Sequence, residues 1–294
     1  MFDYKDCGGW YNASRFLILS LMNIDLHCHT NVSDGALPPQ ELVNLALERE
    51  IDLLSITDHD SVAAYDSITN PSDKLRIVPG IEFSTFWQKS GVHIVGLDLD
   101  LSNAALQQGV AQQSAAREVR ADKIAEKLAR LGHDNCLEGA KSYTSGGQVG
   151  RPHFAQHLVA IGAVSNIQQA FKRYLGAGKP GDIKEQWADM ATVVDWIRGA
   201  GGIAVLAHPT KYKMTGTKLS GLVQHFTAVG GEAIEVISGL QIPSVTRDMA
   251  NLARKNSLLA SCGSDFHSSN QPWAALGMVA QLPESCTPIW TRWT

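Results

Sequence analysis

The chain has 294 residues, 44% of them hydrophobic and 18% charged, which is enough apolar material for one large core with an inserted subdomain. Its formal net charge of −4 argues against a protein that coats long nucleic acid and favours a small or terminal substrate. The five cysteines form no C-x-x-C pair, so we expect neither a disulfide framework nor a zinc knuckle, and a reducing, cytoplasmic compartment fits. No apolar run reaches about 18 residues, and we expect no membrane association and no obligate protein partner.

Residues 1–21 lack the periodicity of a helix or strand. The apolar stretch after Arg15 resembles a signal peptide, but its basic region is one arginine and no A-x-A site follows. Met22 stands directly before the first predicted strand, and our hypothesis is that Met22 is the natural start. We therefore expect a chain lacking residues 2–21 to keep its stability and activity.

The first predicted strand, near residues 24–28, carries two histidines spaced by two. Successive side chains of a strand point to opposite faces, so His27 and His29 share one face and Cys28 points to the packed side. The turn at Asp34-Gly35 can return the Asp34 carboxylate to the same place. One histidine alone is usually structural, but this combination favours a metal site.

A helix that begins near Pro38-Pro39 and a second strand at residues 53–57 complete a β-α-β unit ending in His59. Ligands bind at the carboxyl ends of parallel strands. For Asp60 two roles stay open: orienting His59 or capping the following helix.

Two further apolar runs each carry one ionisable group. Residues 75–84 predict a third strand with Glu82, and residues 92–98 predict a fourth with His93. Beside the other candidate ligands, Glu82 is expected to bridge two cations.

Residues 102–186 lack the alternating pattern of strands, and their composition predicts an inserted, mostly helical subdomain. Residues 106–131 predict one or two helices, in which Arg117 and Arg120 lie one turn apart and can fork onto one phosphate. The lysines of the same face are interpreted as solvated. A helix start follows at residues 150–155, and then a glycine-rich loop at 174–180.

The alternation of strands and helices resumes after the insert. Strands are expected at 202–209, ending in His208, and at 233–238, 258–267 and 276–282, with Asp265 and His267 closing the third of these. The fold class is therefore α/β: a distorted (β/α)7 TIM-like barrel from residues 22–101 and 187–290, with residues 102–186 inserted.

Nine imidazole and carboxylate side chains fall at or near strand ends: His27, His29, Asp34, His59, Glu82, His93, His208, Asp265 and His267. This donor set, free of thiolates, suits Mn²⁺, with Zn²⁺ or Fe²⁺ as alternatives. Nine ligands are too many for one ion, and two or three divalent ions fit.

The ordered motifs H-x-H, T-D-H-D, G-I-E, V-H-I-V-G, A-H-P and G-S-D-F-H resemble the PHP (polymerase and histidinol phosphatase) family of metal phosphoesterases. The insert, with R-P-H-F-A, G-K-P and Q-W, resembles a bacterial subgroup of 3′,5′-nucleoside bisphosphate phosphatases that also act as 5′-to-3′ exoribonucleases. The substrates so implied are a small nucleotide and the 5′ ends of short RNA.

The resemblance implies three ions. The first would be held by His27, His29, Glu82 and Asp265, the second by Asp34, His59 and His267, and the third by Glu82, His93 and His208. It also implies that Arg117, Arg120, Arg151 and His153 contact the substrate.

Two ions sharing a hydroxide would direct it at phosphorus, so no protein nucleophile is expected. The general acid is either His208 or a metal-bound water. Two rival functions are a histidinol-phosphate or other small-molecule phosphatase and a non-catalytic metal-binding regulatory module.

Overall fold

The computed structural model describes residues 22–70, 72–144, 147–183 and 187–293, so the hypothesis about residues 1–21 lies outside them. Three parallel strands form one sheet in the order β1 (Ile24–Cys28), β2 (Leu53–Ile56) and β3 (Arg76–Ile77). Five strands form the other, in the order β4 (Gly80–Trp87), β5 (Ser90–Leu97), β6 (Ile203–Leu206), β7 (Ala233–Ser238) and β8 (Leu259–Gly263).

Isolated bridges join the two sheets into a distorted barrel. Cys28 pairs with Phe266 beyond β8, and His59 beyond β2 pairs with Glu82 of β4. The predicted α/β class is confirmed, with one difference in strand direction: β5 runs antiparallel to both neighbours. A two-residue turn at 88–89 connects β4 to β5, too short for the crossover that a parallel pair needs.

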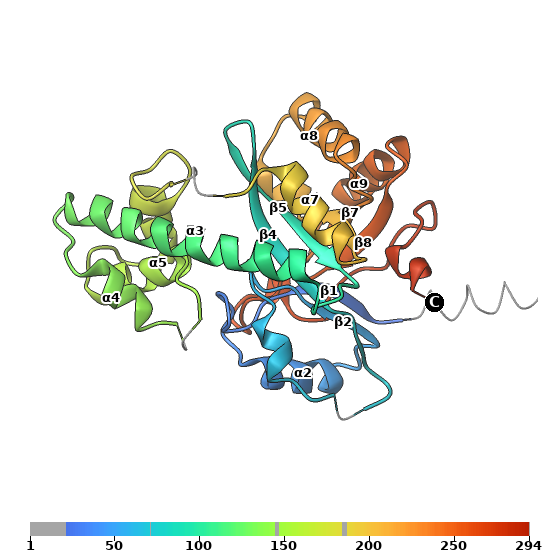
Figure 1. Ribbon diagram of the computed structural model, residues 1–294, viewed down its shortest axis with the longest axis horizontal. Coiled ribbons are helices and arrows are strands. Elements are labelled where there is room, and N and C mark those ends of the chain that lie inside the picture. Colours follow the sequence, from blue (N-terminus) through green and yellow to red (C-terminus); the bar gives the residue numbers. More distant parts are fainter. Residues whose placement is uncertain (1–21, 71, 145–146, 184–186, 294) are drawn as a thin grey trace, which may run out of the picture.

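Four helices cover the outside of the barrel (Figure 1): α2 (Pro39–Glu48), α7 (Met190–Gly199), α8 (Gly216–Ala228) and α9 (Pro243–Lys255). In α7 the side chain of Asp189 caps the first turn, and Val193, Val194 and Ile197 face the core. Short 3-10 turns complete the barrel at Ala63–Asp66, Pro209–Tyr212, Pro272–Ala274 and Ile289–Arg292.

The run at 75–84 divides into β3 and β4 at Pro79-Gly80, where the sequence itself predicts a break, because Pro79 interrupts pairing between them. One strand prediction is corrected. The predicted strand at 276–282 is wrong. Leu276 is buried, but Gly277 has φ +72 and its N–H donates to the Asp25 carboxylate, so the chain turns instead of extending.

The inserted helices are α3 (Ala104–Ala129), α4 (Cys136–Lys141), α5 (Arg151–Ala160) and α6 (Ile167–Ala170), followed by a π turn at Phe171–Leu175. They have a core of their own, which includes Ile124, Leu128 and Phe154. The first turns of α3 pack on the barrel, with Leu106 in its core. One continuous helix therefore belongs to both parts (Figure 1). No helix among the described residues is long and apolar enough to span a membrane.

Candidate metal centre and arginine cavity

At the end of β1 the two histidines and the cysteine between them point to opposite sides of the strand, as predicted. The rings of His27 and His29 lie 5.1 Å apart between centroids, and both residues are completely buried. Cys28 lies in an apolar cluster with Leu54, and its thiol donates to the Ser55 carbonyl. The alternation of β1 therefore directs the imidazoles to one side and the thiol to the other.

All nine sequence-predicted ligands lie together at one end of the barrel. Their donor atoms form overlapping groups within which the atoms lie no more than 4.8 Å apart. The groups are His29, Asp34, His59 and His267; His27, His29 and Asp265; His27, Glu82 and His208; and His59, Glu82 and His93.

Glu82 occupies the centre of the cluster. Its Oε1 lies 2.9 Å from Nδ1 of His93 and 2.8 Å from Nε2 of His208. Its Oε2 lies 2.8 Å from Nδ1 of His59 and 3.4 Å from Nε2 of His29. The two oxygens of one carboxylate thus face different imidazoles, which is the placement that a bridging ligand needs.

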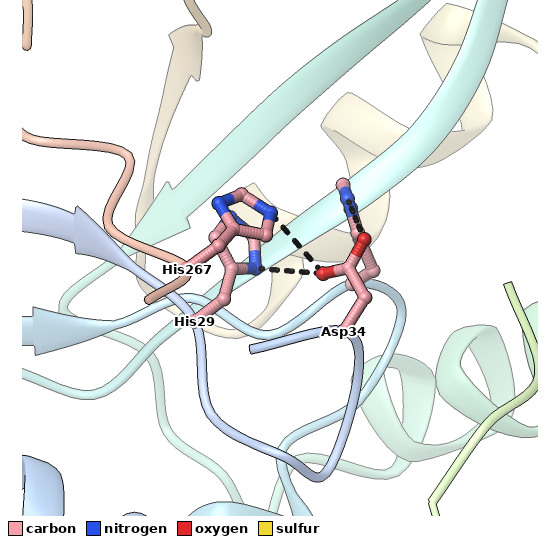
Figure 2. A group of neighbouring side chains, drawn as sticks. His29, Asp34 and His267 are labelled. Carbon is pink, nitrogen blue, oxygen red and sulfur yellow. Dashed lines mark ion pairs between the residues drawn. The ribbon is translucent and has the colours of Figure 1, made fainter. Parts of the chain in front are cut away.

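Asp34 is a second carboxylate that lies between imidazoles (Figure 2). Its Oδ1 lies 3.2 Å from Nε2 of His267 and 3.9 Å from Nδ1 of His29. Asp34 lies in the loop after β1, so the predicted return of this carboxylate to the site is what the structure shows.

The loop that carries Asp34 is fixed by Asp58, a residue that the sequence did not single out. The Asp58 carboxylate accepts from the Thr30 N–H at 2.8 Å and from the Ser33 hydroxyl at 2.6 Å. Burial raises the pKa of Asp58 to about 6. Its position two residues after β2 was the available signal, but the sequence alone could not separate it from the neighbouring candidates.

The cluster fits divalent cations. Buried atoms without a hydrogen-bond partner include Nδ1 of His29 and Nδ1 of His208. Leaving such atoms unpaired is costly unless an ion satisfies them. In addition, Nε2 of His27 faces Nε2 of His29 at 3.1 Å, an arrangement that a shared cation explains.

The pKa shifts divide the cluster. Burial alone would lower the pKa of an imidazole, but neighbouring carboxylates raise the pKa of some of those present, including His27 and, to about 9, His267, so a cation bound there would displace protons. Other ligands are already held in the protonation states that metal binding requires. Burial, together with the neighbouring His267, lowers the pKa of His29 to about 3. Burial also lowers the pKa of His93 to about 4. For Glu82, burial alone would raise the pKa, but the surrounding imidazoles, His93 first, hold it well below its usual value. The imidazoles of His29 and His93 are therefore neutral and the Glu82 carboxylate is ionised near neutral pH.

Glu235, in β7, was also missed by sequence reasoning. It is 2% exposed, and its Oε1 lies 2.5 Å from Nδ1 of His27 while its Oε2 accepts from the His208 N–H at 2.5 Å. A carboxylate on Nδ1 fixes the tautomer and leaves Nε2 free to bind a cation. The run AIEVIS predicted a strand, and a single buried acid in it was the signal.

Three residues of the site have positive φ without being glycine: His208 at 27°, Asp265 at 55° and Asp60 at 52°. Such conformations cost of order 1–3 kcal/mol each and collect at functional sites.

Neither predicted role of Asp60 is correct. Its carboxylate accepts from Arg117 Nε and Nη2, each at 2.7 Å, and from the Ser84 N–H at 2.7 Å. Gln113 donates to the same carboxylate at 3.1 Å. The 3-10 turn that follows has Val62 at its N-cap, so Asp60 caps no helix. Asp60 instead fixes the position of the Arg117 guanidinium through this buried ion pair.

A cavity of about 490 Å³ joins the predicted arginines to the ligand cluster. It is lined by Arg117, Arg120 and Arg151 together with Asp34, His59, His93 and His208. The ring of Trp187 contacts two of the guanidinium groups: its centroid lies 5.3 Å from Cζ of Arg117 and 5.2 Å from Cζ of Arg120. Burial and the adjacent Arg151 and Arg117 lower the pKa of Arg120 to about 9. This concentration of positive charge favours an anion.

His153 and Lys211 lie at the other side of this region. His153 is buried, its Nδ1 accepts from the Gly150 N–H at 2.9 Å, and it lines a second cavity rather than the arginine cavity. Lys211, missed from the sequence, pairs with Asp265 and lines both cavities. Thus the three arginines line one cavity, and His153 lines the adjoining one.

Six imidazoles and three carboxylates gather at one end of an α/β barrel, beside an arginine cavity, and this is the candidate ligand set of a metal-dependent barrel enzyme. The chain belongs to the PHP domain family, whose model matches residues 25–199.

Similar proteins cover nearly the whole chain. The 5′-3′ exoribonuclease Rnm of Escherichia coli is 41% identical over 273 residues, covering 92% of this chain and 93% of the relative. The 3′,5′-nucleoside bisphosphate phosphatase of Chromobacterium violaceum is 39% identical over 273 residues, with 92% and 96% covered. The structure of an amidohydrolase from Chromobacterium violaceum, with bound sulfate and no metal, has a TM-score of 0.85 and 38% identity, with 92% and 95% covered.

Proposed function

We propose that this protein is a metal-dependent phosphoesterase that removes the 3′-phosphate of nucleoside 3′,5′-bisphosphates and releases nucleotides, 5′ to 3′, from 5′-phosphorylated RNA. One observation carries the proposal: the cavity that contains three arginines opens directly onto the ligand cluster. A substrate with two phosphates can then place one at each end. The names of the relatives from Escherichia coli and Chromobacterium violaceum support both reactions.

The nine clustered side chains would hold two or three divalent ions, with Mn²⁺ preferred over Zn²⁺ or Fe²⁺, and Glu82 would bridge. When bound, the ions supply Lewis acidity toward the phosphoryl oxygens and the attacking water. Within the protein, Glu235 orients His27, and Asp58 holds the loop of Asp34. The thiol of Cys28 points away and donates to the Ser55 carbonyl, so Cys28 is not placed to act as a nucleophile there.

The arginines would recognise the 5′-phosphate. Arg117 is fixed by Asp60, so it presents its remaining N–H groups at a defined place. Arg151 lies 4.0 Å from the Asp182 carboxylate, and Nε of Arg120 donates to the Ile183 carbonyl at 2.9 Å. A phosphate dianion would relieve the repulsion among the three guanidinium groups.

Both reactions break the same bond. Water attacks the phosphorus attached to the 3′ oxygen of the first nucleoside, the P–O3′ bond breaks, and the 3′ oxygen takes a proton. The products are a 5′-nucleotide and either inorganic phosphate or an RNA that keeps the phosphate on its new 5′ end. That proton would come from a metal-bound water or from His208, which lines the cavity.

The test compares adenosine 3′,5′-bisphosphate with RNA bearing a 5′-phosphate or a 5′-hydroxyl, using Mn²⁺-loaded protein. We expect phosphate release from the bisphosphate and shortening of the 5′-phosphorylated RNA alone. Arg120→Gln with Arg151→Gln should raise KM at least about tenfold, since a hydrogen bond to a charged group contributes roughly 1.5–3 kcal/mol. Arg130→Gln, at an exposed position of the chain, is the matched control.

Activity on histidinol phosphate or p-nitrophenyl phosphate without activity on either nucleotide substrate would leave a phosphoesterase and refute the role of the arginines. A purified protein without bound transition metal and without activity after reloading would favour a non-catalytic binding module.

A further inference from the structure

A second cavity, of about 670 Å³, opens onto a different part of the ligand cluster. It reaches Asp265 and His267, whereas the arginine cavity reaches His59 and His93. The two cavities share four lining residues, Asp34, Pro152, Phe171 and Lys211, so they meet at the cluster. Both volumes lie within the range of roughly 300–1,000 Å³ that is usual for ligand pockets.

The lining of the second cavity differs in chemistry from that of the first. Among the described residues that line it, Lys211 at the shared border is the one lysine or arginine. The remainder is rich in amide and aromatic side chains, which include Gln156, Asn270, Gln271 and Trp273. Aromatic rings stack on nucleobases and amides hydrogen-bond their edges, while a terminal phosphate requires cations.

Trp273 is the most prominent of these side chains. It is 60% exposed, although the backbone beneath it is well held. Its carbonyl accepts from the Leu240 N–H at 2.7 Å, and the next residue, Ala274, is buried and donates to the Gln271 carbonyl. Tyr143, 40% exposed, lines the same cavity from the inserted helices. A rigid backbone thus presents a ring to the solvent beside the reaction centre.

We propose that the second cavity binds the nucleotide that follows the scissile phosphate in RNA, with Trp273 stacking on its base. This inference rests on the proposed function. With the 5′-phosphate among the arginines and the scissile phosphate at the ligand cluster, the rest of the strand must leave through the other opening. A nucleoside bisphosphate ends at that phosphate, so it occupies the arginine cavity alone.

The experiment measures kcat/KM for adenosine 3′,5′-bisphosphate and for a 5′-phosphorylated pentaribonucleotide, with the full chain and bound Mn²⁺. Trp273→Ala should lower the value for RNA by about 5- to 150-fold, the range for loss of one stacked base. The value for the bisphosphate should stay within about twofold of wild type. Trp273→Phe, which keeps a ring, should restore most of the RNA activity.

Leu240→Ala is the matched control. Leu240 is 77% exposed and bonded through its backbone to Trp273, but it does not line the cavity. It should change neither activity.

Four outcomes would overturn the assignment. An equal loss of kcat/KM on both substrates after Trp273→Ala would indicate a structural role. No loss of kcat/KM on either substrate would show that the ring does not contact RNA. If Leu240→Ala costs as much RNA activity, or if either variant changes the oligomeric state in light scattering, the exposed face is a protein contact. Wild-type protein inactive on both substrates would overturn the proposed function together with the subsite, and this result is distinct from the other three.

Discussion

The pair formed by Asp60 and Arg117 yields the sharpest test of the structure, through the substitution Asp60→Asn. Asp60 is completely buried and Arg117 is 7% exposed, so the asparagine would leave a guanidinium without its counter-charge. Breaking a buried ion pair in this way costs about 3–5 kcal/mol. We expect a value near the lower limit, about 3 kcal/mol, because Arg117 also borders the arginine cavity.

For a chain of this size, about 3 kcal/mol corresponds to a fall in Tm of roughly 6 °C. Thermal melts and urea titrations of Asp60→Asn, Arg117→Gln and the double variant would give the coupling free energy. The double variant should be more stable than the sum of the single losses by at least about 1.5 kcal/mol, because no unpaired charge remains. Glu126→Gln, which breaks an exposed ion pair with Arg130 on the same helix, should cost about 0.5 kcal/mol or less. Additive losses from Asp60→Asn and Arg117→Gln would refute the reasoning.

Three further outcomes are expected. Glu235→Gln should lower metal affinity 10- to 100-fold in chelator competition, because it loses the carboxylate on His27 Nδ1; an effect equal to that of Glu232→Gln, a half-buried glutamate paired with Arg292, would argue against this. Removal of metal should lower Tm by about 5 °C relative to protein with free metal at 100 times its Kd, because binding at that concentration stabilises the folded state by about 2.7 kcal/mol. Readdition of metal should restore the original Tm. Gly35→Ala should abolish most activity, because its Cβ would overlap the His29 carbonyl and displace Asp34, whereas Gly216→Ala, with open space around it, should be silent.

The sequence was sufficient for the ligand cluster because strand ends carry the ligands. Two histidines spaced by two on one strand must share a face, and so the spacing of His27 and His29 is enough to pair them. The barrel brings strand ends together, which collects His59, His208 and Asp265 from distant parts of the chain, whereas Glu82 and His93 lie within β4 and β5. Periodicity also predicted most strands, since buried strands read as short apolar runs.

Three features depended on tertiary contacts that no local pattern contains. The antiparallel direction of β5 follows from a tight turn, not from its composition. The apolar run at 276–282 lacks a neighbouring strand and turns at Gly277. Asp60 had an evident neighbour in sequence, His59, but its partner Arg117 lies 57 positions away on α3. Long-range ion pairs of this kind leave no periodic signal.

The contact between Asp60 and Arg117 also bears on specificity. Asp60 follows the candidate ligand His59 directly, so one peptide bond and one 2.7 Å ion pair separate the ligand cluster from the arginines. Because α3 is continuous from the barrel into the inserted helices, Arg120 moves with Arg117. In the proposed mode of binding, these rigid elements would fix the distance between the two phosphate positions. A fixed distance of this kind would discriminate by geometry: a substrate whose two phosphates are separated by one ribose would satisfy both ends, and a monophosphate would satisfy one end only.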